Sequence, residues 1–194
     1  MSYGHRLNLE EIFFELAESK FLEATQKQGV VRNRDASTGK NTSFDGYPSV
    51  HALAAASIAV VGWATSLEAF TNMAWNAHIA PTIPAGTIRE MAIKNLSTVE
   101  KLKELFVSFS FDLGKANWWA TIGQLFRIRN KLVHFREERS YQGFSFADPT
   151  RLVLSAQAVA DMRFSAIQCI NQLGKLSGLS TKFTNGDYEF ESVW

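Results

Sequence analysis

Apolar residues recur at helical spacing in the first part of the chain. They follow a period of about 3.6 residues from Leu9 to Gln28, which predicts a helix that ends at Gly29. The next stretch, 29–49, is rich in Asn, Asp, Ser and Gly and predicts a long polar loop. A loop of this length in a compact domain is typical of a mobile or functional segment.

The segment 49–80 predicts the longest helix, which opens after Pro48 and closes before Pro81. From Val50 to Leu67 it is apolar on nearly every face, and a helix of that kind lies at the centre of a bundle. Alanine dominates this run, which is shorter than the roughly 20 strongly apolar residues of a membrane span. We therefore expect a buried helix in a cytoplasmic protein that has no membrane partner.

Further helices are predicted downstream. They cover 87–95, 98–109, 118–135 and 149–173, and a strand or ordered arm is expected over 188–194. Ser97 and Glu100 have the spacing of a capping box at the start of the second of these helices. Asp148 followed by Pro149 predicts the cap of the last helix, and Gly174 predicts its end.

The chain shows no repeat of fixed period and no run of paired strands. We expect an all-α fold, a helical bundle of about five helices of which three are long. The 194 residues, 46% of them hydrophobic and 20% charged, fit one domain with a sizeable core. This domain spans 1–194, with the bundle core at 49–174, the polar loop 29–49 before it and a C-terminal arm over 175–194.

Charge and cysteine content narrow the function. Twenty basic and nineteen acidic residues give a formal net charge of +1, which excludes a protein that coats nucleic acid over a broad face. Any contact with nucleic acid is therefore expected at a local patch. The single cysteine, Cys169, excludes an internal disulfide framework and a cysteine metal cage. No residues have the spacing of a metal-ligand set, so we expect neither a metal nor a cofactor.

The amphipathic helix over 118–135 carries one arginine on its apolar side. Its apolar stripe consists of Trp118, Ile122, Leu125, Phe126, Leu132 and Val133. Arg129 falls near the middle of that stripe, whereas Arg127 and Lys131 fall on the opposite side. Because an unpaired charge on a buried face is costly, Arg129 needs a partner.

The central helix offers that partner. Glu68 is the only acidic residue of this helix, and Asn72 and Asn76 follow it at four-residue steps on the same face. We expect Glu68 and Arg129 to meet. Such a contact is either a structural ion pair that fixes the register of two helices or part of a functional site, unless the arginine head escapes to solvent.

His134 lies five residues after Arg129, and Asn130 directly follows the arginine. Arginine and histidine together suit phosphodiester chemistry, because histidine titrates near neutrality and arginine holds a phosphate through two oxygens. In RNA the 2′-hydroxyl can be the nucleophile, so no metal is required. Five residues turn an ideal helix by about 140°, so the two side chains do not share a face. Either the helix ends near His134, or the arginine reaches round, or two protomers each supply part of the site.

The segment Arg129-Asn130-x-x-x-His134 resembles the motif of the HEPN superfamily (higher eukaryotes and prokaryotes nucleotide-binding), which is Arg, a polar residue, three further residues and His. The sequence around Glu68 is similar to the central helix of many members. Some of these families carry Lys or Arg four residues after the Glu, where this chain has Asn72.

The resemblance implies an all-α bundle that forms a homodimer, in which two motifs face one composite cleft. It also implies metal-independent endoribonuclease activity that leaves 2′,3′-cyclic phosphate and 5′-hydroxyl ends, in toxin–antitoxin systems, phage defence or RNA processing. His134 then corresponds to the proton-transfer group, Arg129 to the phosphate contact and Asn130 to an orienting group. Glu68 corresponds to the residue that holds Arg129, and Asn72 is a further supporting position.

Four basic residues around the motif are candidate contacts to an RNA backbone: Arg127, Lys131, Arg136 and Arg139. They also fit a solvated face, since Glu137 and Glu138 dilute the patch. Two other functions stay open. One is a non-catalytic HEPN-like module that binds RNA, a nucleotide or a protein such as an antitoxin or regulator. The other is a structural helical dimer in which Arg129 and Glu68 only fix packing.

Overall fold

The computed structural model describes residues 9–37, 50–86, 95–133 and 154–179, and side chains in the first helix as far as Gln26. All regular structure in these ranges is helical. The α-helices are α1 (Leu9–Ser37), α2 (Val50–His78), α4 (Thr98–Ser108), α5 (Trp119–Val133) and α7 (Ala156–Ser177), and the short 3-10 helices are η1 (Ala80–Thr82) and η2 (Leu113–Lys115). The prediction of an all-α bundle with about five helices, three of them long, is confirmed for the described part of the chain.

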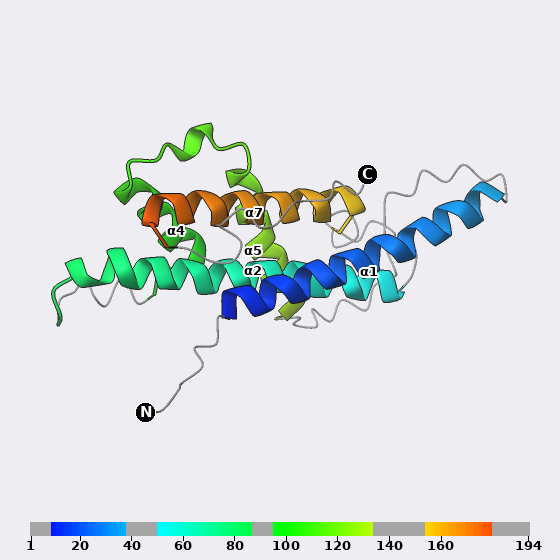
Figure 1. The fold of residues 1–194 in the computed structure, drawn as a ribbon, viewed down its shortest axis with the longest axis horizontal. Coiled ribbons are helices and arrows are strands. Elements are labelled where there is room, and N and C mark those ends of the chain that lie inside the picture. Colours follow the sequence, from blue (N-terminus) through cyan, green and yellow to red (C-terminus); the bar gives the residue numbers. More distant parts are fainter. Residues whose placement is uncertain (1–8, 38–49, 87–94, 134–153, 180–194) are drawn as a thin grey trace, which may run out of the picture.

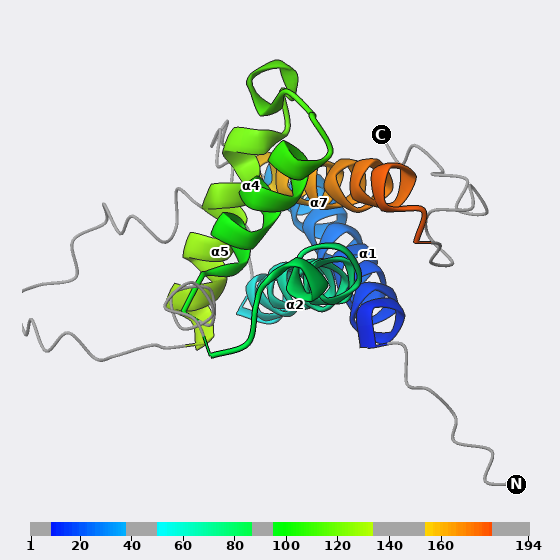
Figure 2. The same ribbon diagram turned by 90° about the vertical axis from the view of Figure 1, so that its left-hand side faces the viewer.

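The central helix of the bundle is α2, which contacts α1, α4, α5 and α7. α1 and α7 lie along it, and α4 and α5 cover another flank (Figure 1, Figure 2). Its buried apolar side chains form the middle of the core: Ala55, Ala56, Ala59, Val60, Trp63, Ala64, Leu67, Phe70, Ala74 and Trp75. The stretch His51–Thr82 is long and apolar enough to cross a membrane by length and composition alone, a test that core helices of soluble proteins also pass, and just over half of its apolar window is buried.

α1 and α2 approach each other closely at Gly62. A Cβ atom at this position would lie 2.9 Å from the Cβ of Ala17 and 2.9 Å from the carbonyl oxygen of Phe13. One turn further along α2, the hydroxyl of Ser66 donates a 2.6 Å hydrogen bond to the carbonyl oxygen of Glu10. Small side chains on both helices therefore allow the two backbones to pack against each other.

An ion pair that the sequence did not reveal joins α1 to α7. The guanidinium of Arg163 donates to both carboxylate oxygens of Glu18 at 2.6–3.0 Å. Trp63 of α2 donates its indole N–H to the same carboxylate at 2.9 Å, and the guanidinium lies 5.3 Å from the centroid of the Phe21 ring. This cluster fastens three helices together, and its acidic and basic side chains are 14% and 24% exposed.

The first helix does not end at Gly29 as predicted. α1 continues to Ser37, so the predicted loop is wrong over 29–37, and 38–49 lie outside the described residues. A glycine inside a helix costs only about 1 kcal/mol relative to alanine, so it does not end a helix by itself.

α7 begins and ends at residues other than those predicted. Its N-cap is Ser155, whose side chain accepts a hydrogen bond from the backbone N–H of Ala158, and the predicted cap at Asp148 lies outside the described residues. Gly174 is buried inside the helix, whereas Gly178 adopts a left-handed conformation with φ of 67° at its end. The helix therefore ends at the glycine whose backbone takes a positive φ, which glycine tolerates best.

α4 begins at Thr98, as predicted. The Ser97 side chain accepts from the backbone N–H of Glu100, and the carboxylate of Glu100 accepts from the backbone N–H of Ser97, which confirms the capping box. The predicted segments 87–95 and 188–194 lie outside the described residues, apart from Asn95.

Gly62→Ala is expected to destabilise the protein by about 1–3 kcal/mol, because the new methyl group overpacks the contact with α1. Gly123→Ala in α5 is the matched control. No atom lies within 4 Å of the Cβ it would gain, so its stability should stay unchanged or rise by up to about 1 kcal/mol. Urea unfolding followed by circular dichroism measures both variants, and wild-type stability of Gly62→Ala would contradict the close approach of α1 and α2.

Candidate functional site

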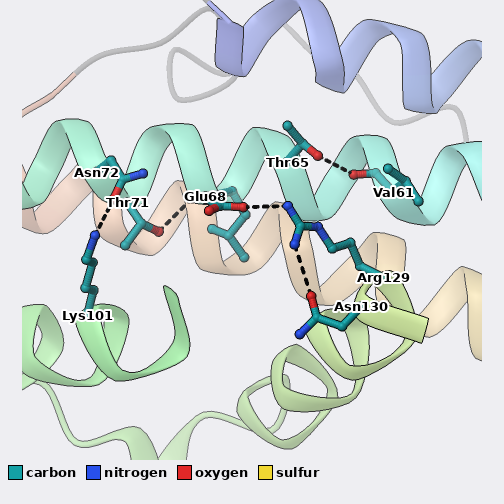
Figure 3. Close-up of polar contacts among 9 residues, drawn as sticks. Val61, Thr65, Glu68, Thr71, Asn72, Lys101, Arg129 and Asn130 are labelled. Atoms are coloured by element: carbon teal, nitrogen blue, oxygen red, sulfur yellow. Dashed lines mark hydrogen bonds and ion pairs between the residues drawn. The ribbon is translucent and has the colours of Figure 1, made fainter. Parts of the chain in front are cut away.

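Arg129 and Glu68 meet between α5 and α2, as predicted. The Nη2 of Arg129 donates to Oε2 of Glu68 at 3.1 Å, and its Nη1 donates to Oδ1 of Asn130 at 3.0 Å (Figure 3). The side chains of Arg129 and Glu68 are 24% and 36% exposed, so the pair lies at the margin of the core. The arginine head is therefore held on α2 and does not extend freely into solvent.

The packing of α5 explains this placement. Its buried side chains are Ile122, Leu125, Phe126 and Ile128. They turn Arg129 toward α2 at the edge of the apolar face, whereas Arg127 and Lys131 are exposed on the solvent side, as predicted. Two details of the expected stripe are wrong, since Ile128 belongs to it and Val133 is 49% exposed.

The guanidinium of Arg129 keeps unused hydrogen-bonding capacity. A guanidinium carries five N–H donors. Two of its nitrogens bond to Glu68 and Asn130, whereas its Nε is buried and has no partner among the described residues. A buried donor without an acceptor is costly, so a purely structural arginine is expected to have all its buried N–H groups hydrogen-bonded. Arg129 does not meet this expectation.

A second cation lies on the same side of α2. Lys101 of α4 donates from Nζ to Oδ1 of Asn72 at 2.9 Å (Figure 3). Asn72 follows Glu68 by one helical turn, about 6 Å along the axis. We call Glu68 and Asn72 the polar edge of α2, and each of them holds a cation from a different helix. Sequence reasoning missed Lys101, because a lysine beside an apolar stripe is common in amphipathic helices.

Hydroxyl groups near this edge bond within α2 itself. Thr65 donates to the carbonyl oxygen of Val61 at 2.8 Å, and Thr71 donates to that of Leu67 at 2.6 Å (Figure 3). The hydroxyl hydrogens of both threonines are therefore used within α2. The charged groups that contact Glu68 and Asn72 are Arg129 and Lys101.

Two groups elsewhere have shifted pKa values with clear physical causes. The hydrogen bonds that Glu100 receives from the Ser97 side chain and backbone lower the pKa of its carboxyl group. Burial raises the pKa of the Cys169 thiol, which lies in the hydrophobic core. Neither group contacts the polar edge of α2.

The two tryptophans that precede the motif belong to an aromatic cluster. Trp118 packs at 5.7 Å from Phe106 and 6.4 Å from Phe111, between ring centroids, and is 7% exposed. Trp119 packs edge-on against Phe106 and Trp118. Trp118 is therefore a core residue and does not offer a free stacking face.

Several predicted site residues lie outside the described part of the chain: His134, Arg136 and Arg139. Their roles stay predictions. Among the described residues, no group of three or more His, Cys, Asp or Glu side chains could hold a metal ion.

No protein-family model, no curated protein and no solved structure matches this chain. The resemblance to the HEPN superfamily therefore stays a prediction from the residues of the motif.

A double-mutant cycle of Arg129→Met and Glu68→Gln is expected to give a coupling energy of about 1 kcal/mol, because the pair is only partly exposed. Arg127→Met removes an exposed arginine two residues away and should change stability by less than about 0.5 kcal/mol.

Glu18→Gln is expected to lower the free energy of unfolding more than Glu68→Gln, since the Glu18 carboxylate is less exposed and bonds to two side chains. Thermal and urea unfolding measure these differences, and zero coupling between positions 129 and 68 would contradict the contact.

Proposed function

We propose that this protein is a metal-independent endoribonuclease of the HEPN type, which acts as a homodimer in which two Arg129–His134 motifs face one cleft. The observation that carries the proposal is the contact between Arg129 and Glu68. An arginine that belongs to a phosphodiesterase motif is held at a fixed place on the central helix by the one carboxylate of that helix. A fixed guanidinium is pre-organised to bind a phosphate, because it loses little freedom on binding.

The proposed reaction needs only groups of the chain and of the RNA. The 2′-hydroxyl oxygen attacks the adjacent phosphorus, and the bond from phosphorus to the 5′-oxygen breaks. The products are a 2′,3′-cyclic phosphate and a 5′-hydroxyl. His134 transfers the proton that leaves the 2′-hydroxyl or the one that the 5′-oxygen gains. Arg129 stabilises the negative charge that develops on the phosphate oxygens, and Asn130 orients the guanidinium.

The comparison of two ion pairs in this structure supports a functional role for Arg129. Arg163 makes three short hydrogen bonds to Glu18 and covers an aromatic ring, which is the pattern of a structural cross-link. Arg129 makes one hydrogen bond to Glu68, and its Nε has no partner among the described residues. Nη1 and Nη2 of Arg129 make one hydrogen bond each, so each keeps a second N–H that can donate to an anionic ligand.

A non-catalytic module that binds RNA or a protein partner, such as an antitoxin, is the second candidate. The near-neutral charge of +1 favours it, because many proteins that act on long RNA carry a larger basic excess. The two candidates differ in turnover, since the module binds RNA without cleaving it.

His134→Ala is expected to lower RNA cleavage in the presence of EDTA by about 10²–10⁴-fold, because it removes the proton-transfer group. His51→Ala is the matched control, since His51 lies at the other end of α2, about 25 Å along the helix from Glu68, and should cleave like wild type. The measurement is cleavage of mixed RNAs with analysis of the product ends. Full activity of His134→Ala in preparations free of contaminating nuclease would contradict the proposal, and RNA binding without cleavage by wild type would favour the binding module.

A further inference from the structure

Lys101 carries a positive charge that no described carboxylate neutralises. Its side chain is half-buried, and its one hydrogen bond goes to the neutral amide oxygen of Asn72. An ammonium group has three N–H donors, so two of them stay available. A half-buried cation with no counter-charge loses hydration without a compensating ion pair.

Two carboxylates in this part of the fold are engaged elsewhere, and Glu104, three residues after Lys101 on α4, is exposed. Glu100 bonds to Ser97 in the capping box, and Glu68 bonds to Arg129. Lys101 also lies in the first turns of α4, where the helix dipole is positive and disfavours a cation. Neither an ion pair among the described residues nor the dipole of α4 therefore stabilises the charge of Lys101.

The arrangement of α4 and α5 brings Lys101 and Arg129 to one side of α2. The start of α4 and the final turns of α5 both reach the polar edge of α2 (Figure 3). The polar edge of α2 therefore holds two cations, one on Asn72 and one on Glu68, and includes one carboxylate, so these charges sum to a net positive charge. Their anchor residues, Asn72 and Glu68, are one turn apart, about 6 Å along the axis.

We propose that Lys101 and Arg129 bind two successive phosphates of one RNA strand. This inference rests on the proposed function and deepens it, because it makes the ligand an oligonucleotide with adjacent phosphates. Arg129 holds the phosphate that reacts, and Lys101 holds its neighbour. Asn72 fixes the position of the ammonium group and leaves two of its donors for phosphate oxygens. Because these contacts go to the backbone, they act in the same way on RNAs of different sequence.

The test is the binding of fluorescent 2′-O-methyl oligonucleotides, which lack the nucleophilic hydroxyl, to the full chain over a range of salt concentrations. Lys101→Gln is expected to weaken binding about four-fold at 0.15 M salt and to reduce the slope of log K against log salt by about 0.7, the value for one phosphate of a single strand. The loss should be equal for oligo-U and oligo-A. Lys101→Arg keeps the charge and should restore both quantities.

Lys103→Gln is the matched control, since Lys103 is an exposed lysine of the same helix and its loss changes the net charge equally. It should bind like wild type with an unchanged salt slope. Identical binding by Lys101→Gln and Lys103→Gln would overturn the role of Lys101 while RNA binding by the protein stands. A normal salt slope combined with lower thermal stability in Lys101→Gln would likewise overturn it, because Lys101 would then only fasten α4 to α2. A wild-type protein that binds no oligonucleotide would overturn the proposed function and this inference together.

Discussion

The burial of α2 is the constraint on which the rest of the structure depends. This helix is packed against four others, so every polar group that it buries needs a partner. Ser66 finds one in the backbone of α1, and Thr71 finds one in its own helix. Glu68 and Asn72 are satisfied instead by cations from α5 and α4. The need to satisfy two polar side chains on an apolar helix thus assembles a positively charged edge at the margin of the core.

The connection between α4 and α5 brings these two cations to the same place. The aromatic side chains of Phe106, Phe111 and Trp118 pack against one another where the two helices are joined. Ser110 in this connection adopts a left-handed backbone with φ of 56°, which is uncommon for a residue other than glycine. The packed turn fixes one end of the helix pair, and the start of α4 and the final turns of α5 meet α2 at the other end. The fold therefore links an aromatic turn to the geometry of the candidate site.

Sequence patterns predicted the parts of this arrangement that depend on periodicity. The apolar run of α2 and the arginine within an apolar stripe sufficed to place α2 at the centre and to pair Arg129 with Glu68. Lys101 could not be found in this way, because its contact with Asn72 depends on how α4 crosses α2. The pair of Glu18 and Arg163 was missed for the same reason. Glycines misled the prediction of two helix ends, since spacing does not show which of them adopts a positive φ.

We propose that Arg129, held by Glu68, is a phosphate contact of a ribonuclease site that includes His134. A crystal structure of the protein with a 2′-O-methyl RNA tests it most directly, because this ligand binds but cannot supply the attacking hydroxyl. We expect a phosphate oxygen within about 3 Å of the Arg129 guanidinium, with the imidazole of a His134 within hydrogen-bonding reach of the same phosphodiester. RNA bound elsewhere on the molecule, with Arg129 in contact only with Glu68 and Asn130, would contradict it.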